Sequence, residues 1–313
     1  MKKLLVALVV LLALGAAGFW LLTAPSTYEL VRGAPDVTVA SAPNLENGRT
    51  LFWAGGCASC HATPGQDDRT RLGGGLALES PFGTFHAPNI SPHPRDGIGG
   101  WDVASFIRAM REGVSPDGRH YYPAFPYTSY QRMGASDLAD LFGFLKTLSA
   151  VEGRAPDHVL PFPYNLRRGL GLWKLAFLDG KQAQSDPSKS AEWNRGRYLV
   201  EGPGHCAECH SPRAFTGAIV ADKRLSGGPD PEGKGFVPNI TQHEAGLKSW
   251  SKADIAELLK TGFTPEYDAV GGSMGPVIRN TSQLGDADRG AMAEYLKSLP
   301  PVASPPRPAK KAD

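Results

Sequence analysis

Two short motifs account for every cysteine of this chain. The sequence CASCH covers residues 57–61 and CAECH covers residues 206–210, and the chain has four Cys in all. In each motif two cysteines stand three positions apart, and a histidine directly follows the second one. Any fold of this chain must therefore present the same Cys/Cys/His arrangement twice.

The pattern C-x-x-C-H is typical of the covalent attachment of c-type haem. Two thiols about one helical turn apart add to the two vinyl groups on one edge of a porphyrin, and the histidine that follows binds the iron from one side. We therefore predict two covalently bound haem c groups. The predicted attachment residues are Cys57, Cys60, Cys206 and Cys209, and the predicted iron ligands are His61 and His210.

Two other uses of these cysteines fit the sequence less well. The cysteine pairs of a structural zinc site normally lie about 15–20 residues apart, whereas nearly half of the chain separates Cys60 from Cys206. Disulfides or thioredoxin-like redox pairs would not require a histidine after both motifs, and no βαβ pattern surrounds them. Haem attachment is therefore the preferred interpretation.

The two motifs lie in two copies of one repeated unit. The sequence GRTLFWAGGCASCH (48–61) matches GRYLVEGPGHCAECH (196–210), and APNIS (87–91) matches VPNIT (237–241). The matches follow in the same order along both copies. The length of 313 residues also suggests two domains, because a domain usually has about 100–200 residues.

Each copy contains three segments in which apolar residues recur at helical spacing. One helix is expected near Gly48 or Gly196, with the cysteine motif close to its end. The other expected helices cover 102–113 and 136–148 in the first copy, and 251–262 and 286–299 in the second. These patterns predict a mainly α fold in which each domain is a small helical unit.

The exported part of the chain resembles the membrane-anchored, multi-haem cytochrome c subunits that partner bacterial periplasmic dehydrogenases for alcohols and gluconate. The resemblance is carried by APNISPHPRDGIGGW (87–101), GVSPDGRHYYPAFPYTSY (113–130), LPFPYNLRRGLGLWKLAFLDG (160–180) and VGGSMGPVIRNTSQL (270–284). Such subunits usually hold three haems, whereas this sequence has two motifs. The resemblance implies two tandem class I cytochrome c domains after an N-terminal transmembrane helix.

The repeat and the resemblance together predict the boundaries of the domains. The expected segments are a transmembrane anchor (1–23), a linker (24–41), cytochrome c domain 1 (42–152), an interdomain linker (153–187), cytochrome c domain 2 (188–302) and a disordered tail (303–313). Residues 166–178 of the interdomain linker are apolar but too short to span a membrane. They are expected to pack between the domains, to touch the bilayer surface or to dock a partner.

The N-terminus favours a membrane anchor. Residues 4–22 carry no charge and follow Lys2 and Lys3, and about 20 apolar residues span a bilayer. The lysines would stay in the cytoplasm, which places the haem domains in the periplasm of a bacterium, at the inner membrane. The alternative is a signal peptide cleaved near residues 15–17. The formal net charge of +2, without Lys/Arg clusters, argues against nucleic acid as a partner.

Methionines are the first candidates for the second axial ligand of each iron. For the second haem, Met274 in GGSMGPV is the predicted ligand, since glycines allow the backbone to approach a porphyrin face. For the first haem, the resemblance implies PAMPY, whereas this chain has PAFPY with Phe125, which cannot bind iron. We predict Met133 as the ligand, with His120 or an open iron as alternatives.

Three further side chains are interpreted from their positions. Asn89 and Asn239 stand in the tripeptide PNI of the two copies and are candidates for hydrogen bonds to haem propionates. The alternative is that each is a turn residue bonded to its own backbone. His205, which directly precedes Cys206, is interpreted as a surface residue.

These observations predict a dihaem c-type cytochrome that relays single electrons from a periplasmic dehydrogenase to the respiratory chain. The expected acceptor is a terminal oxidase or a soluble cytochrome, and the chain is expected to be an electron-transfer subunit more than a catalyst on its own. The alternative function is a peroxidase-like dihaem enzyme with an open distal site at the first haem.

Overall fold

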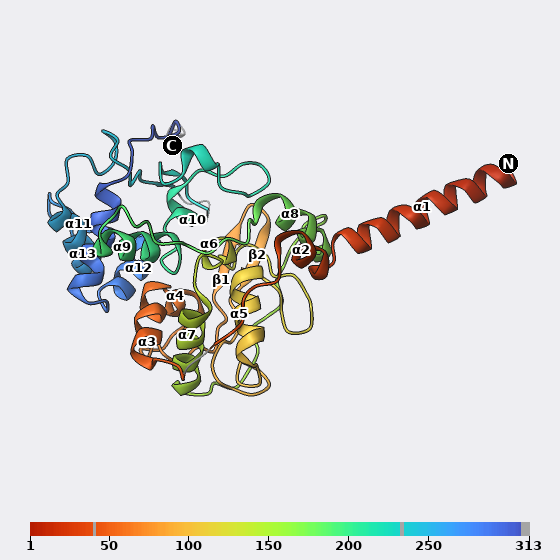
Figure 1. Cartoon of the computed structure of the whole chain (residues 1–313), viewed down its shortest axis with the longest axis horizontal. Helices are drawn as coiled ribbons and strands as arrows, with labels where there is room; N and C mark the ends of the chain where they lie inside the picture. The colour runs from red at the N-terminus through yellow and green to blue at the C-terminus, as the bar shows by residue number, and fades with distance from the viewer. Residues whose placement is uncertain (40–41, 232–234, 308–313) are drawn as a thin grey trace.

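The computed structural model describes residues 1–39, 42–231 and 235–307 of the chain. Two helical domains lie beside each other, and one long helix extends away from them (Figure 1). The tail predicted for 303–313 has no helix or strand over 303–307, and its remainder lies outside the described residues. Residues 40–41 of the predicted first linker and residues 232–234 of the second domain also lie outside the described residues.

The first domain consists of short helices and one β-hairpin. Its elements are α3 (Leu45–Ala54), α4 (Cys57–His61), β1 (Ala77–Ser80), β2 (Gly83–His86), α5 (Val103–Glu112), α6 (Tyr127–Tyr130) and α7 (Ala135–Thr147). The strands β1 and β2 are antiparallel, and Leu78 pairs with Phe85. The helices expected near Gly48, over 102–113 and over 136–148 are thus all present.

The second domain repeats this arrangement. Its elements are α9 (Ala191–Glu201), α10 (Ala207–His210), η2 (Ala221–Lys223), β3 (Gly228–Pro229), β4 (Phe236–Val237), α11 (Lys252–Thr261), α12 (Met274–Thr281) and α13 (Asp286–Lys297). The helices expected near Gly196, over 251–262 and over 286–299 correspond to α9, α11 and α13. The short helices α6 and α12 were not expected from the sequence.

The first and last helices of each domain cross where one of them carries a glycine. α3 packs on α7, and α9 packs on α13. A Cβ on Gly48 would lie 2.1 Å from the carbonyl oxygen of Asp140, and a Cβ on Gly196 would lie 1.8 Å from that of Ala291. Because any side chain there would push the helices apart, only glycine permits this close approach.

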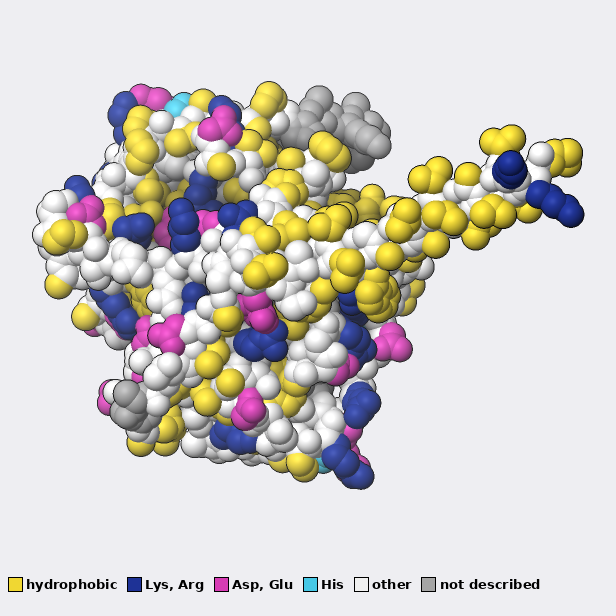
Figure 2. Space-filling model, turned by 45° about the vertical axis from the view of Figure 1, so that its right-hand side comes forward, with side chains coloured by type: hydrophobic (Ala, Val, Ile, Leu, Met, Phe, Trp, Pro, Cys, Tyr) yellow, Lys and Arg dark blue, Asp and Glu magenta, His cyan; other side chains and the backbone are white. Residues whose placement is uncertain are grey.

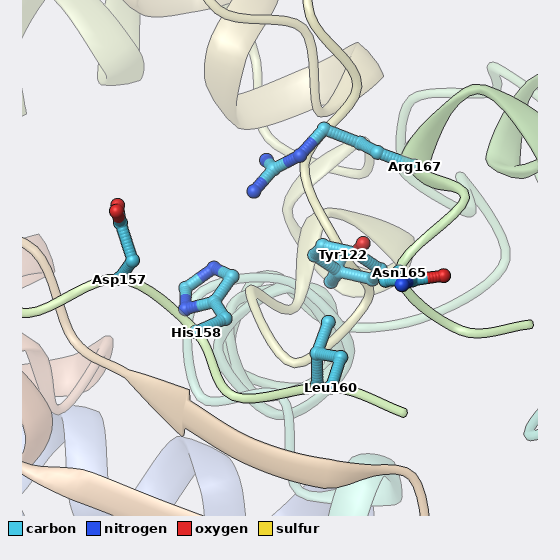
Figure 3. A pocket seen from close by; sticks show the side chains of 6 residues that line it. All are labelled: Tyr122, Asp157, His158, Leu160, Asn165 and Arg167. Carbon is cyan, nitrogen blue, oxygen red and sulfur yellow. The ribbon is translucent and has the colours of Figure 1, made fainter. Parts of the chain in front are cut away.

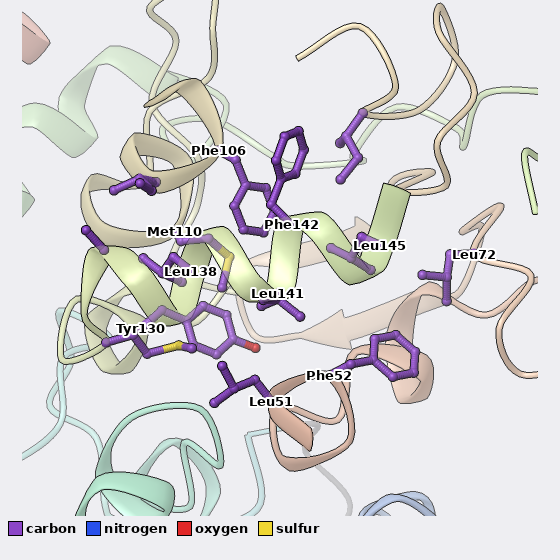
Figure 4. Packing of buried hydrophobic residues seen from close by; sticks show 14 of the residues in the cluster. Leu51, Phe52, Leu72, Phe106, Met110, Tyr130, Leu138, Leu141, Phe142 and Leu145 are labelled. Carbon is purple, nitrogen blue, oxygen red and sulfur yellow. The ribbon is translucent and has the colours of Figure 1, made fainter. Parts of the chain in front are cut away.

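The core of the first domain lies between α3, α5 and α7 (Figure 4). Phe106 of α5 stacks on Phe142 of α7 with 4.9 Å between ring centroids, and Leu51 of α3 is fully buried. The second domain has its own core, built in the same way from α9, α11 and α13. Each copy of the repeat therefore buries most of its own apolar residues, although Ala54 of α3 belongs to the second cluster.

Matching helix caps in the two domains explain where the middle helix begins and ends. The side chain of Asp102 accepts a hydrogen bond from the backbone of Ser105 at the start of α5, and Ser251 and Asp254 form a capping box at the start of α11. Gly113 ends α5 with φ 61° and Gly262 ends α11 with φ 82°. Such left-handed conformations favour glycine.

The N-terminal helix α1 (Lys2–Leu22) is long and apolar enough to cross a membrane, and none of its residues is buried. A signal sequence near the N-terminus would satisfy the same description. After α1 the chain forms α2 (Pro25–Arg32), within the segment expected to be a linker.

The interdomain linker also contains a helix that the sequence did not reveal. η1 (Arg167–Gly169) leads into α8 (Leu170–Phe177), which packs on α2. The indole N–H of Trp173 donates a hydrogen bond to the carbonyl oxygen of Thr216 in the second domain at 2.9 Å. One side of the apolar segment 166–178 therefore packs inside the protein.

A buried polar cluster joins α8 to the end of α1. The ring nitrogen Nε2 of His120 lies 2.8 Å from the carbonyl oxygen of Thr23, and Nδ1 lies 3.1 Å from Nζ of Lys174. Lys174 is fully buried and also donates to the carbonyl oxygen of Gly113 at 2.6 Å. Burial lowers the pKa of Lys174 to about 7. The neighbouring carboxyl of Glu112 has its pKa raised to about 7, mainly by burial.

The cluster predicts a pH dependence of stability that originates at His120. Burial, with the charge of Lys174 adding to it, lowers the pKa of this histidine from 6.5 to about 4. The unfolded chain therefore binds more protons between these two values, so the free energy of unfolding falls as the pH falls through them. As the pH falls from 6.5 to about 4, the titration of His120 therefore lowers the free energy of unfolding by about 3 kcal/mol.

We expect His120→Gln to remove this contribution, which is measured as the difference between variant and wild type in denaturant unfolding at pH 7 and pH 4. Glu112 titrates with the opposite sign, but it is present in both proteins and largely cancels in the difference. The control is His243→Gln, in a loop where the ring accepts a bond from the backbone of Ala245. If the free energy of unfolding changed equally with pH in wild type and His120→Gln, the pH dependence would not originate at His120.

Candidate haem sites and the junction between them

Each cysteine motif forms a single short helix with its histidine at the end, α4 in the first domain and α10 in the second. In both motifs Nδ1 of the histidine lies 2.8 Å from a proline carbonyl oxygen, His61 facing Pro88 and His210 facing Pro238. A ring that donates its Nδ1–H to this carbonyl leaves Nε2 free to bind a metal and cannot rotate. The two predicted iron ligands are therefore oriented in the same way.

The surroundings of the motifs fit a bound haem. Burial lowers the pKa of both His61 and His210, and both residues remain partly accessible. Burial also raises the pKa of the Cys57 and Cys206 thiols to about 12. The histidines are thus kept in the neutral form that binds iron.

Met274, the predicted second axial ligand of the second haem, packs on the core of the second domain. It is the first residue of α12, which follows Gly271, Gly272 and the N-cap residue Ser273. Its partly accessible side chain packs on the apolar cluster that Cys206 also contacts. The structure thus brings Met274 and the attachment motif of the second domain to the same cluster. Its role as a ligand stays a prediction.

Phe125 occupies the corresponding place in the first domain. The isolated bridge between Val114 and His120 matches the bridge between Phe263 and Ala269, so this loop has the same register in both copies. In this register, Phe125 of the first copy is the counterpart of Met274 in the second copy. Phe125 packs on the first-domain core beside Tyr121 and Tyr130.

Met133 is fully buried in the core of the first domain. The equivalent residue of the second copy, Leu284, is also buried, and a Cβ on Gly202 in the other domain would lie 3.6 Å from Cγ of Met133. Met133 thus has the environment of a core residue, and its role as an iron ligand stays a prediction. The alternative ligand His120 has both ring nitrogens bonded within the buried cluster, so binding an iron would require one of these bonds to break.

Asn89 and Asn239 are both buried, and each fastens the chain that leaves its domain. The amide of Asn89 donates to the carbonyl oxygens of Val151 at 2.7 Å and Gly153 at 2.8 Å. The amide of Asn239 donates to the carbonyl oxygen of Val302 at 2.8 Å and to Ser304 Oγ at 3.0 Å. Their side-chain oxygens accept bonds two residues on. A propionate would have to replace one of these bonds, so that role stays a prediction.

The residue directly before the second cysteine of each motif contacts the opposite domain. Ser59 of the first motif accepts a hydrogen bond from Nδ2 of Asn280, in α12, at 2.6 Å. Glu208 of the second motif accepts bonds from Thr128 at 2.6 Å and Ser129 at 2.7 Å, both in α6. Since α6 and α12 are corresponding helices, the contact between the domains is reciprocal.

Glu208 is the charged centre of this junction. Its carboxylate pairs with Arg213 at 2.8 Å in addition to its bonds across the domain boundary. Burial raises the pKa of Glu208, but Arg213 and the two hydroxyl groups outweigh burial, so the pKa lies below its usual value. The carboxylate is therefore ionised and has three hydrogen-bond donors.

His205 was interpreted as a surface residue, and this is wrong. Its Nε2 lies 3.2 Å from the carbonyl oxygen of Gly55 in the first domain, and its ring contacts Tyr130 edge to face, with 5.7 Å between centroids. The hydroxyl of Tyr130 donates to the same carbonyl at 3.4 Å. The residues that precede Cys57 and Cys206 are therefore in direct contact, and both attachment motifs lie at the domain boundary.

An open cleft of about 180 Å³ lies elsewhere, between the interdomain linker and Tyr122 (Figure 3). The guanidinium of Arg167 stands 4.7 Å above the ring of Tyr122, and His158 Nδ1 accepts a bond from the backbone of His86. The lining residues are Tyr122, Asp157, His158, Leu160, Asn165 and Arg167. None of the predicted haem ligands lines this cleft.

Comparison with known proteins supports two haem-bearing domains. The family model for cytochrome c matches residues 45–149 and 194–300, and each range contains one C-x-x-C-H motif. A dihaem cytochrome c-type protein of Cereibacter sphaeroides is 48% identical over 303 residues, which cover 96% of this chain and 99% of that protein.

Two further relatives belong to named dehydrogenases. One of the subunits of nicotinate dehydrogenase from Pseudomonas putida is 42% identical over 265 residues, which cover 85% of this chain and 22% of that protein. The fructose dehydrogenase cytochrome subunit of Gluconobacter japonicus is 39% identical over 279 residues, which cover 87% of this chain and 57% of that protein. The chain therefore spans only part of the length of these two relatives.

The junction predicts that Glu208→Ala is strongly destabilising. Removing a buried carboxylate that has a cation and two hydroxyls as partners costs about 3–5 kcal/mol, because the partners are left unpaired. The free energy of unfolding in denaturant measures this loss. Glu244→Ala, which breaks the exposed pair with Lys248, should cost less than about 1 kcal/mol. If both variants lost less than about 1 kcal/mol of unfolding free energy, the stability of the protein would not depend on Glu208.

The sixth position of the first iron is tested by three matched substitutions. If Met133 binds the iron, Met133→Leu removes the first haem's share of the near-infrared sulfur-to-iron absorption band of the oxidised protein. Met110→Leu, in the same core cluster, should leave the band unchanged. Each substitution should cost less than about 1.5 kcal/mol of stability, because volume is conserved.

The third substitution, Phe125→Met, supplies a sulfur at the place that corresponds to Met274. It should preserve or restore the band in the Met133→Leu background. A wild-type band that is unaffected by Met133→Leu would contradict the ligand role and leave Met133 as a core residue.

Proposed function

Because the chain belongs to the cytochrome c family, we propose that it passes single electrons from a periplasmic dehydrogenase to the respiratory chain. The haem iron supplies the chemistry, since it gains or loses one electron between its ferric and ferrous states. The residues proposed to hold the two haems are Cys57, Cys60 and His61 in the first domain, and Cys206, Cys209, His210 and Met274 in the second.

The observation that carries this proposal is the position of both attachment motifs at one domain boundary. A covalently bound porphyrin edge lies next to its two cysteines. The direct contact between His205 and Gly55 therefore favours a short path between the haems, and electron transfer becomes faster as this path shortens. Two haems on separate faces would serve two independent reactions, whereas two adjacent haems suit a relay.

The chain's own residues keep this arrangement rigid. Ser59 and Glu208 are bonded across the boundary, and the proline carbonyls hold the rings of His61 and His210. An iron whose ligands cannot move changes little in geometry between its redox states, which lowers the cost of each transfer. Rigid ligands at a fixed boundary therefore support electron transfer as the function of the fold.

The proposed partner follows from the relatives. Similarity to subunits of nicotinate and fructose dehydrogenases supports a dehydrogenase as the electron donor. We propose a terminal oxidase or a soluble cytochrome as the acceptor. We further propose that α1 remains as an anchor in the inner membrane and that both domains, over about the residues 42–152 and 188–302, lie in the periplasm.

The peroxidase-like alternative depends on Phe125, which places an apolar ring where the second domain has a methionine. An iron that lacks a ligand on that side would be open to peroxide. A single experiment separates the two functions, because a relay passes electrons to a protein acceptor whereas a peroxidase is reoxidised by hydrogen peroxide.

We expect the haems in intact membranes to become reduced when the substrate of the partner dehydrogenase is added, and to be reoxidised when oxygen is admitted. Candidate substrates are those of the related dehydrogenases, and the absorbance of the reduced haem is the measurement. The control is His210→Ala, which should block the transfer while both haems remain attached. Rapid reoxidation of the isolated reduced protein by hydrogen peroxide, and none by the membranes, would favour the enzyme instead.

A further inference from the structure

We propose that α2 and the interdomain linker form a surface that rests on the lipid of the membrane that α1 crosses. We call this the linker surface. It consists of the exposed side chains of Leu30 and Val31 in α2, Phe162 and Leu166 before α8, and Leu172 in α8. The proposal rests on the proposed function in one respect, since it requires α1 to remain attached.

The length of α1 determines where the globular part begins. A helix of 21 residues is about 32 Å long, which matches the hydrocarbon thickness of about 30 Å. The whole of α1 is therefore needed to cross the bilayer, and Trp20 falls at the depth where Trp is enriched in membrane proteins. Thr23, which ends the helix, must then lie at the lipid headgroups.

The linker is fastened directly to this end of α1. Arg168 donates to the carbonyl oxygen of Trp20 at 2.7 Å, and its guanidinium stands 3.7 Å over the Trp20 ring. The carbonyl oxygen of Thr23 faces His120 at 2.8 Å. A Cβ on Gly171 would lie 2.5 Å from the same oxygen, so α8 touches the end of α1 backbone to backbone.

α2 is held to α8 by contacts of its own. Arg32 donates to the carbonyl oxygen of Leu175 at 2.7 Å, and Tyr28 is buried with its hydroxyl facing the carbonyl oxygen of Leu178. α2 and α8 therefore cannot move away from the end of α1 as separate units. If Thr23 lies at the headgroups, both helices lie there as well.

The outer sides of these elements are apolar although they face away from the protein. Leu30 is 86% exposed, Phe162 76% and Leu172 44%. Figure 2 shows hydrophobic side chains gathered on the globular body around the point where α1 leaves it. Apolar side chains at headgroup depth are stabilised when they enter the acyl boundary, so lipid is the occupant that this position favours.

The same segment connects the membrane to both haem domains. Lys174 bonds the carbonyl oxygen of Gly113 in the first domain, and Trp173 bonds that of Thr216 in the second. A linker that rests on lipid would therefore fix both domains at one distance and one orientation relative to the membrane. A dehydrogenase that approaches along the membrane would then always meet the same face.

The test measures the depth of single labels in the full-length protein with both haems attached. The chain has four Cys, which are consumed by the haems, so an introduced cysteine is the only reactive thiol. Leu172→Cys or Phe162→Cys is labelled with bimane in nanodiscs of phosphatidylcholine and phosphatidylglycerol. The fluorescence is compared between discs with and without doxyl-labelled lipid, because quenching by haem is equal in both and cancels.

Two control positions calibrate the result. Leu11→Cys lies in the middle of α1 and reports whether the anchor is inserted. Tyr267→Cys replaces a side chain that is 86% exposed, in the loop between α11 and α12, which lie at the end of the molecule away from α1 (Figure 1). We expect severalfold stronger quenching at Leu172 and Phe162 than at Tyr267.

Each outcome decides between the hypotheses. Quenching at Leu11 but none at Leu172 or Phe162 would overturn the linker surface and leave the anchor intact. Absence of quenching at Leu11, or loss of α1 from the purified protein, would overturn the anchor and the linker surface together. Labels that are unquenched in discs but shielded from soluble iodide in native membranes would show that a partner protein covers the surface, which also overturns contact with lipid.

Discussion

The structure depends on one reciprocal contact, in which each haem-attachment motif is bonded to the opposite domain. Ser59 is held by Asn280 of the second domain, and Glu208 is held by Thr128 and Ser129 of the first. Because the cysteines on either side of these residues are the predicted attachment points of the porphyrins, the junction that stabilises the chain would also set the separation of its cofactors. Stability and electron transfer therefore place the same demand on these few residues.

The two halves of the junction are alike in position but differ in chemistry. The first motif uses a neutral hydroxyl, whereas the second uses a carboxylate that Arg213 keeps ionised. The two copies also diverge at the position predicted to supply the second axial ligand, where Phe125 of the first copy corresponds to Met274 of the second. Axial ligands and nearby charges are the means by which a protein adjusts the potential of a haem. A duplication that preserved the fold has therefore changed the residues that would make the two irons unequal.

Much of this could be predicted from the sequence because the signals are local. The motifs at 57–61 and 206–210 specify their own chemistry, and the apolar periodicity of 102–113 and 251–262 reports a helix that packs on a core. For His205, by contrast, nothing in the neighbouring sequence predicts burial, because the contacts of its ring are with Gly55 and Tyr130 of the other domain. Glu208 gave no such signal, because a carboxylate beside a cysteine is equally compatible with solvent, and only its bonds to Thr128, Ser129 and Arg213 reveal its role.

The helix α8 was missed for a related reason. Its eight residues are apolar almost throughout, so they show no periodicity, and segment 166–178 was compatible with packing, lipid contact or docking. Lys174 is the informative residue, because a lysine within an apolar run needs either water or buried acceptors. The structure gives it buried acceptors, the carbonyl of Gly113 and His120, which turns that side of α8 inward. Once that side is fixed, Leu172 must face outward, which makes it part of the exposed apolar surface beside the end of α1.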